Sequence, residues 1–455
     1  MPRTQSDASE DSVIVRFLYT IVLLILSPIL IFGLYRRRPG KPSIGSRWRE
    51  HFGLTPPLDG VEAPIWIHSV SVGEVMATKL LLPALHARYP DKKIVITTTT
   101  TTGAAQVEAL DLAYVVHRYM PFDFPWAIKG FLRAVKPSLF LSFETEIWPN
   151  TLCAVQKAGV PALLINARLS EKSLRNYRKL SWLMRPALQC FDKIVAIHQD
   201  DAMRFVALGC DERCVEVSGS IKYDLQLSLN VEEQGQALRR FFGKTRPVWI
   251  VASTHEGEEE TVLASFQQIK QALPDALMVW VPRHPERFNV VAELSSDAGF
   301  TVQRRTEHVK HAHIRESAEL ENQLDSAVDI YLGDTMGEML LMLASADIVF
   351  MGGSLLGKKV GGHNFIEPAL LGKVSVTGPS FYNFADLSQQ LFTVDGLRVA
   401  GTADKIAESI VLQLADKEDL VSRGALARET VKQNQGAIER LNSVIYSLLK
   451  TQQER

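Results

Sequence analysis

Both halves of the chain repeat one pattern, in which a short apolar, largely β-branched run is followed by a longer segment with helical spacing. Uninterrupted apolar runs of this length are typical of parallel strands that are buried on both faces. The strands expected in the first half are residues 65–68, 93–98, 139–143, 162–165 and 193–197. Those expected in the second half are 248–252, 276–281, 328–332, 348–351 and 374–376. The sequence therefore predicts an α/β fold with two Rossmann-like, doubly wound domains.

The charge of the chain changes sign between the two halves. From Arg36 to Lys222 there are 25 basic and 17 acidic residues, a net charge of +8, whereas from Tyr223 to Arg455 there are 23 and 31, a net charge of −8. We place the join in the polar segment where this reversal occurs, which predicts an N-terminal domain at 41–225 and a C-terminal domain at 226–455. A basic first domain suggests an anionic partner.

The N-terminus carries a candidate membrane anchor, which we place at residues 1–40. Residues 17–35 form a run of 19 without a charge, long enough to span or nearly span a bilayer. Acidic residues precede the run, and basic residues follow it directly: Arg36, Arg37, Arg38 and Lys41. This charge order is the reverse of that in a cleaved signal peptide, and it predicts that the rest of the chain lies in the cytoplasm. The run is compatible with a helix that spans the membrane or lies in its interface.

Several absences narrow the possible chemistry. The chain has neither a Gly-x-Gly-x-x-Gly motif after a strand nor a Walker A motif, which argues against dinucleotide oxidoreductases and P-loop ATPases. It has no Asp-x-Asp motif to hold a metal on a diphosphate sugar. The four cysteines are too few for a disulfide framework, and Cys210 and Cys214 lack the partners of a zinc site. His255-Glu256 lacks the second histidine of a zinc protease, and Ser253 with Glu256 has the spacing of a helix cap.

Ligands of doubly wound sheets bind beyond the carboxyl ends of the strands, and a cleft between the two domains is the expected active site. In the first half, Glu74 follows the first strand, at the start of a helix expected from about Val75. It is either a general base for a hydroxyl or a simple partner of the helix dipole, and spacing alone leaves both open. Glu144, followed by Glu146, ends a buried strand, which favours a functional role because burying an unpaired carboxylate is costly. Lys222 could neutralise an anion, although most lysines are merely exposed.

Four segments of the second half predict a nucleotide site. Residues 282–287 contain two arginines and a histidine at a strand end, and arginine binds phosphate with two hydrogen bonds. Residues 333–339 form a turn into a helix start that can bind an anion. The glycines of 352–354 and 361–368 allow main-chain amides to approach phosphate oxygens, and Glu367 can accept hydrogen bonds from a ribose.

Six motifs, in this order along the chain, resemble those of one known family. They are HSVSVGE (68–74), FETEIWPN (143–150), NARLS (166–170), PRHPERF (282–288), GDTMGEM (333–339) and GGHNFIEP (361–368). Together they are similar to the 3-deoxy-D-manno-octulosonic acid (Kdo) transferases, inner-membrane enzymes of lipopolysaccharide synthesis in Gram-negative bacteria. The resemblance covers nearly the whole chain.

The resemblance implies a GT-B fold and an inverting transfer of Kdo from CMP-Kdo to the lipid A precursor, with no metal, no further cofactor and no nucleic acid partner. It implies that Glu74 is the general base and that Glu144 and Lys222 stabilise the transition state. The residues that match the CMP-binding segments of the family are Pro282, Arg283, Met336, Gly337, Glu338, Asn364, Phe365, Ile366 and Glu367. Phe365 departs from the family pattern, which usually has proline there.

Two other functions remain open from the residues alone. The acidic loops also suit a GT-B transferase that uses a UDP-sugar, and a membrane-tethered nucleotide-binding protein without catalysis would keep much of the same pattern. The sequence leaves open the number of Kdo residues added and the oligomeric state.

Overall fold

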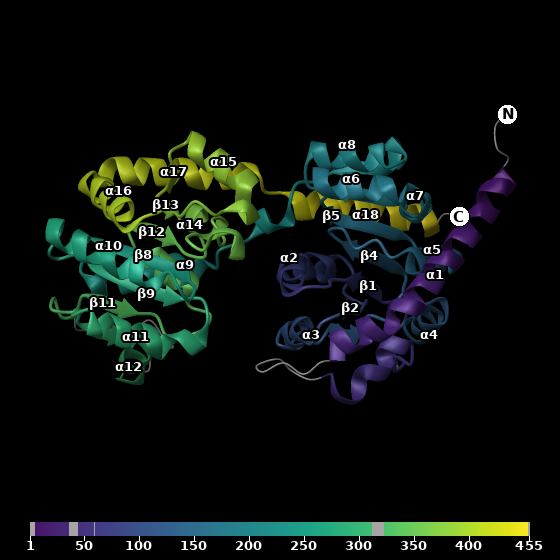
Figure 1. The fold of residues 1–455 in the computed structure, drawn as a ribbon, viewed down its shortest axis with the longest axis horizontal. Coiled ribbons are helices and arrows are strands. Elements are labelled where there is room, and N and C mark those ends of the chain that lie inside the picture. The colour runs from purple at the N-terminus through teal and green to yellow at the C-terminus, as the bar shows by residue number, and fades with distance from the viewer. Residues whose placement is uncertain (1–4, 36–43, 59, 312–322, 454–455) are drawn as a thin grey trace. The chain divides into compact units, whose positions relative to one another are not determined.

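The computed structural model describes residues 5–35, 44–58, 60–311 and 323–453. The chain forms two compact units, one comprising Met1–Asp224 and Gln435–Arg455 and the other Leu225–Asn434. Among the described residues, each unit is built on a seven-stranded parallel sheet (Figure 1). The α/β fold with two doubly wound units is therefore as predicted.

The sheet of unit 1 has the order β3-β2-β1-β4-β5-β6-β7, with a topological switch point between β1 and β4. Its strands are β1 (Ile65–His68), β2 (Ile94–Thr98), β3 (Val115–Tyr119), β4 (Leu139–Phe143), β5 (Ala162–Ala167), β6 (Lys193–Ala196) and β7 (Val215–Val217). Its helices are α1 (Gln5–Tyr35), α2 (Val72–Arg88), α3 (Thr101–Glu108), α4 (Pro125–Val135), α5 (Pro149–Lys157), α6 (Glu171–Lys179), α7 (Ser181–Leu188), α8 (Gln199–Ala207) and α18 (Ala437–Gln453). Short 3₁₀ turns include η1 (Gly45–Phe52) and η3 (Ile221–Asp224).

The sheet of unit 2 has the order β10-β11-β9-β8-β12-β13-β14, with its switch point between β8 and β12. Its strands are β8 (Val248–Thr254), β9 (Leu277–Pro282), β10 (Val302–Arg304), β11 (Ile330–Leu332), β12 (Ile348–Met351), β13 (Val374–Thr377) and β14 (Leu397–Val399). Its helices are α9 (Leu229–Phe242), α10 (Glu259–Ala272), α11 (Phe288–Asp297), α12 (Arg305–His311), α13 (Met339–Ser345), α14 (Ile366–Leu370), α15 (Ala385–Thr393), α16 (Ala403–Ala415) and α17 (Lys417–Gln433).

The ten predicted strands are the ten inner strands of the two sheets. The four strands that the sequence pattern did not reveal, β3, β7, β10 and β14, are the four sheet edges. An edge strand is less buried than an inner strand, because it has only one neighbouring strand. All three residues of β10, for example, are partly exposed. The uninterrupted apolar pattern is therefore missing where a strand lacks a second neighbour.

The C-terminal helix departs from the predicted domain division. We expected the second domain to run to residue 455, but α18 packs on unit 1. Its residues Ala437, Leu441 and Ile445 are fully buried in a cluster with strand residues such as Ile65 and Leu163. Their spacing of four places them on one face of the helix, and this face covers the sheet of unit 1 beside α2.

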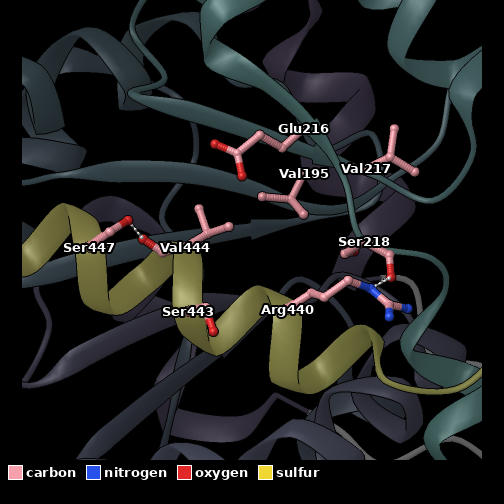
Figure 2. A pocket seen from close by; sticks show the side chains of 8 residues that line it. All are labelled: Val195, Glu216, Val217, Ser218, Arg440, Ser443, Val444 and Ser447. Atoms are coloured by element: carbon pink, nitrogen blue, oxygen red, sulfur yellow. Dashed lines mark hydrogen bonds between the residues drawn. The ribbon is translucent and has the colours of Figure 1, made fainter.

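Hydrogen bonds hold the start of α18 against Asp224, the last residue of the first chain segment of unit 1. The Asp224 carboxylate accepts from the main-chain N–H groups of Gly436 (2.6 Å) and Ile438 (2.5 Å). Arg440 Nε donates to the Ser218 carbonyl at 2.7 Å, as Figure 2 shows. A pocket of about 340 Å³ lies at this junction between α18 and the β6–β7 edge of the sheet. Its lining consists of Val195, Glu216, Val217, Ser218, Arg440, Ser443, Val444 and Ser447.

Helix α1 contains the predicted apolar run. Ile14–Tyr35 is long and apolar enough to cross a membrane, with a mean hydropathy of 2.5. The helix lies beside α5 and α7 of unit 1 (Figure 1). The basic residues that we expected to orient the anchor, 36–38 and 41, lie outside the described residues.

One predicted helix cap is wrong. Ser253 and Glu256 have capping-box spacing, but α10 begins at Glu259. Ser253 instead lies within β8, with a positive φ of 59°.

We expect Leu441→Ala to destabilise unit 1 by about 2–5 kcal/mol, because it leaves a cavity in a fully buried cluster. Hydrogen exchange resolved by peptide would localise the loss. The matched control is Leu412→Ala in α16, since that side chain is 62% exposed and its loss should change stability by no more than about 0.5 kcal/mol. Faster exchange confined to unit 2 in Leu441→Ala would contradict the assignment of α18.

Candidate active site

Glu74 lies in the first turn of α2, which begins at Val72 and not near Val75 as expected. Ser71 is the N-cap: its Oγ accepts from Glu74 N–H (3.3 Å) and donates to Glu74 Oε1 (2.8 Å). The main-chain N–H of Val70 donates to the other oxygen, Oε2, at 2.8 Å. This is a capping box. The helix-start role that we considered is therefore present, and it also holds the carboxylate in one orientation.

The environment of Glu74 favours the protonated carboxyl. The side chain is buried, which raises its pKa, and the hydrogen bonds from Ser71 and Val70 only partly oppose this effect. The negative charge of Glu144 raises the pKa further. A carboxyl whose pKa is raised in this way is better matched to accepting a proton than one in water.

Glu144 and Lys222 form an ion pair, with 3.2 Å between Oε1 and Nζ. Glu144 directly follows β4 and has a positive φ of 51°, which is unusual for a residue with a side chain. Its main-chain N–H nevertheless bonds to the Ile165 carbonyl (3.0 Å), so the sheet holds it in place. The predicted residues Glu74, Glu144 and Lys222 therefore lie together in unit 1.

Asn166, which the sequence analysis did not single out, positions the Lys222 segment. It is the next-to-last residue of β5, with a positive φ of 49°, and its Oδ1 accepts from the main-chain N–H of Ile221 at 3.1 Å. This bond joins the NARLS motif to η3, 55 positions later. The motif therefore helps to hold the segment that carries Lys222.

Glu146 is the second residue that we did not select, although its acidic side chain follows Glu144 by two positions. Burial raises the pKa of Glu146 to about 7, and the negative charges of Glu74 and Glu144 contribute to this rise. The hydrogen bond that Trp148 Nε1 donates at 2.7 Å lowers the pKa and only partly offsets the effect of burial. Three carboxyl groups therefore share the carboxyl ends of β1 and β4, at the switch point of the sheet. Only their three-dimensional proximity distinguishes Glu146 from a solvated bystander.

In unit 2, Arg283 and Glu367 lie near each other. Pro282 ends β9 and is buried, whereas the Arg283 side chain is exposed and its main-chain N–H donates to the Thr254 carbonyl (3.0 Å). Burial raises the pKa of Glu367, and the hydrogen bond from Asn364 and the charge of Arg283 partly oppose it. An exposed guanidinium beside a largely buried carboxyl can bind a phosphate and a hydroxyl group.

Glu338 is tightly paired within the protein. Arg305 donates to both of its oxygens, from Nη2 at 2.8 Å and from Nε at 3.1 Å, and the Thr335 hydroxyl also contacts it. Burial alone would raise the pKa of Glu338, but these bonds keep it below its usual value. Beside it, Met336 is 67% exposed and Gly337 has a positive φ of 85°. This turn therefore offers main chain and an exposed methionine to a ligand.

At the start of α14, two of the predicted site residues have buried side chains. Asn364 Oδ1 accepts from the Ile366 N–H at 2.9 Å. The side chains of Phe365 and Ile366 are buried, and the Phe365 ring packs against Phe384 with 5.9 Å between centroids. The Phe365 side chain, at the position where the resemblance leads us to expect proline, thus belongs to the core of unit 2, and the residue as a whole is fully buried.

Glu258 holds the glycine loop after β12, a role that nothing in the sequence indicated. Its fully buried carboxylate accepts from four main-chain N–H groups at 2.7–3.0 Å, those of His255, Gly353, Ser354 and Leu355. A Cβ on Gly353 would lie 2.7 Å from the His363 ring, so glycine is needed here. The rings of His255 and His363 meet at 2.8 Å between their Nε2 atoms.

Within the part of the chain that the structure describes, no group of three or more His, Cys, Asp or Glu side chains is arranged to hold a metal ion.

The raised pKa of Glu146 predicts a titration near neutral pH. Its carboxyl should titrate with a midpoint of about 7, and Glu74→Gln should lower that midpoint by removing a negative neighbour. The folded state favours the protonated Glu146 carboxyl. The contribution of this group to the free energy of unfolding is therefore complete below about pH 4.5 and is lost as the pH rises to about 7. Carbon-13 NMR of labelled glutamate, assigned with Glu146→Gln, would measure it. Glu171→Gln, at a largely exposed carboxylate, is the control. A Glu146 midpoint near 4.5 would contradict the burial argument.

The comparisons with known proteins agree on one family. A family model described as 3-deoxy-D-manno-octulosonic-acid transferase (kdotransferase) matches residues 46–225. The 3-deoxy-D-manno-octulosonic acid transferase of Haemophilus influenzae is 35% identical over 441 residues, which cover 96% of this chain and 99% of that protein. The transferase of the same name from Bordetella pertussis is 31% identical, with 93% and 97% covered.

A solved structure supports the fold. The UDP-GlcNAc 2-epimerase of Neisseria meningitidis, solved with UDP-GlcNAc, matches with a TM-score of 0.54 at 13% identity, covering 85% of this chain and all of that one. At this identity the likeness concerns architecture alone, and it agrees with the expected GT-B type of fold with two Rossmann-like units. Together with the two transferases, which match almost end to end, these findings show that the chain belongs to the Kdo transferases, a family of glycosyltransferases.

Proposed function

We propose that this protein transfers Kdo from CMP-Kdo, with inversion, to the lipid A precursor of lipopolysaccharide at the cytoplasmic face of a bacterial inner membrane. The observation that carries the proposal is the position of buried Glu74 beside the Glu144–Lys222 ion pair, in a chain of the Kdo transferase family. A base and a cation at one switch point are what a hydroxyl-to-sugar transfer needs.

In the proposed reaction, the acceptor hydroxyl oxygen attacks the anomeric carbon of Kdo while the bond from that carbon to the phosphate oxygen breaks. CMP leaves with the bonding electrons, and Glu74 takes the hydroxyl proton. Ser71 and Val70 keep the Glu74 carboxylate oriented. Lys222, held by Glu144, supplies positive charge where negative charge develops in the transition state.

The donor site proposed in unit 2 uses the predicted CMP-binding segments. Arg283 would bind the phosphate, and Glu367 would accept hydrogen bonds from the ribose hydroxyls. Main-chain groups of Gly337 and of the partly exposed Asn364 would complete the site. The leaving group is a monophosphate, so no metal is needed to bridge a diphosphate, and we propose a reaction independent of metal and of any further cofactor.

The proposed location follows from the N-terminal half. Helix α1 is compatible with membrane anchoring, and residues 36–222 carry a net charge of +8. A basic domain at a membrane surface suits an acceptor lipid that bears phosphate groups.

Glu74→Gln should lower kcat for Kdo transfer by about 10²- to 10⁴-fold, the usual contribution of a general base. Glutamine retains capping-box chemistry, so folding and CMP binding should be unchanged. Turnover of labelled CMP-Kdo and calorimetric titration with CMP would separate the two effects. Glu171→Gln, which alters an exposed carboxylate, should leave kcat unchanged. Near-normal turnover in Glu74→Gln would contradict the proposal that Glu74 is the general base.

We expect CMP to compete with the donor and UDP at equal concentration to have no effect. EDTA should leave the rate unchanged, because the proposed leaving group needs no metal clamp. Initial rates with each nucleotide and with the chelator would test both points. Competition by UDP would favour a UDP-sugar donor, and loss of activity in EDTA that returns with a divalent ion would contradict the metal-independent reaction.

A further inference from the structure

Helix α1 has two distinct faces. The inner face, turned to unit 1, includes residues at intervals of three and four: Arg16, Thr20, Leu23, Ser27, Ile31 and Leu34. Thr20 Oγ1 accepts from Asn150 Nδ2 at 2.9 Å, and the Arg16 guanidinium contacts Cys153 Sγ. The outer face is apolar and open, since Ile25 and Ile29 are 69% and 71% exposed. An apolar outer face opposite a docked inner face suits a helix that lies in a membrane interface.

Between this inner face and the carboxyl ends of the unit 1 strands lies an apolar pocket of about 330 Å³, a volume typical of small-ligand sites. Its lining comprises Leu23, Ser27, Ile31, Leu34, His51, Val70, Thr99, Met120, Pro121, Phe122, Asp123, Phe124 and Trp148. The one carboxylate in this lining is already paired. Asp123 accepts from the N–H groups of Asn150 (3.0 Å) and Thr151 (2.7 Å) and from the Thr151 hydroxyl (2.6 Å). The pocket therefore favours an apolar occupant.

Two lining residues connect the pocket to the candidate active site. Trp148 lines the pocket and donates from Nε1 to Glu146 at 2.7 Å. Val70 lines it too, and its N–H donates to Glu74 at 2.8 Å. A molecule in the pocket would therefore contact Val70, which is bonded to the carboxylate that we assign as the base.

We propose that this pocket binds an acyl chain of the acceptor lipid. The proposal rests on the proposed function and deepens it. The chain would enter from the membrane along the inner face of α1, so that the headgroup hydroxyl comes to Glu74 while the lipid remains anchored. A membrane helix forms one wall and the loops that hold the acidic residues form the other, which is the arrangement an acylated substrate needs and a water-soluble acceptor does not.

The test fills the pocket from α1. Ile31→Trp places a large side chain in it, whereas Ile29→Trp makes the same change two residues away on the exposed outer face. Transfer rates would be measured with the fully acylated acceptor and with its de-acylated headgroup. We expect Ile31→Trp to raise KM for the acylated acceptor at least tenfold and to leave KM for the headgroup and CMP binding unchanged. Ile29→Trp should change none of these values.

Equal KM values for the acylated acceptor in the two variants would overturn the proposal. A second measurement covers a misfolded variant: an acceptor with a photoreactive acyl chain should label the wild-type pocket, for example at Met120. Equal labelling by a phospholipid with the same photoreactive chain would assign the pocket to bulk membrane lipid and overturn the acceptor assignment. A wild-type protein that transfers Kdo to neither acceptor would instead contradict the proposed function itself.

Discussion

In both units, carboxylates are buried at the carboxyl ends of parallel strands, and the surrounding loops depend on the hydrogen bonds that these carboxylates accept. Each buried carboxylate requires donors, and the loops are shaped to supply them. Glu258 binds four main-chain N–H groups and so fixes the loop after β12. Glu74 is held by a helix cap, and Glu144 is met by Lys222, whose segment is in turn fixed by Asn166. The positive φ values of Glu144 and Asn166 are the backbone strain associated with these arrangements.

The carboxylates divide into two kinds according to how completely they are satisfied. Glu258 has donors on both oxygens and no solvent exposure, which is a structural role. Glu74 is buried and Glu146 and Glu367 are partly buried, and their hydrogen bonds do not fully offset the loss of water, so their pKa values are raised. Perturbed groups of this kind are typical of sites that bind or move protons. The raised pKa values in the loops after β1 and β4 therefore agree with the proposed catalytic role of this region, whereas the fully bonded Glu258 holds a loop in place.

What could be predicted from the sequence depended on whether the signal was local. Inner strands such as 139–143 were found because burial on both faces leaves an uninterrupted apolar run, whereas the exposed edge β10 leaves none. The motif residues Glu74, Glu144 and Lys222 were found together as expected. The roles of Asn166 and Glu258 arise from partners distant in sequence, so spacing could not reveal them. For Glu146, spacing could not reveal its burial or the nearby charge of Glu74. The buried residues of α18 have the spacing of an amphipathic helix, but this spacing carries no information about which sheet the helix covers.

Helix α1 shows how one segment can serve two physical demands. Its composition is compatible with a membrane anchor, and a helix that only anchored would gain nothing from hydroxyl groups on one face. Thr20 and Ser27 nevertheless lie on the face turned to unit 1, where Thr20 bonds to Asn150 and Ser27 lines the apolar pocket. Small side chains at these positions allow the helix to approach the soluble unit closely and leave space beside the strand ends. In the proposed reaction, the same helix tethers the enzyme and forms a wall of the path by which the lipid acceptor reaches the buried Glu74, so that anchoring and acceptor selection become one structural feature.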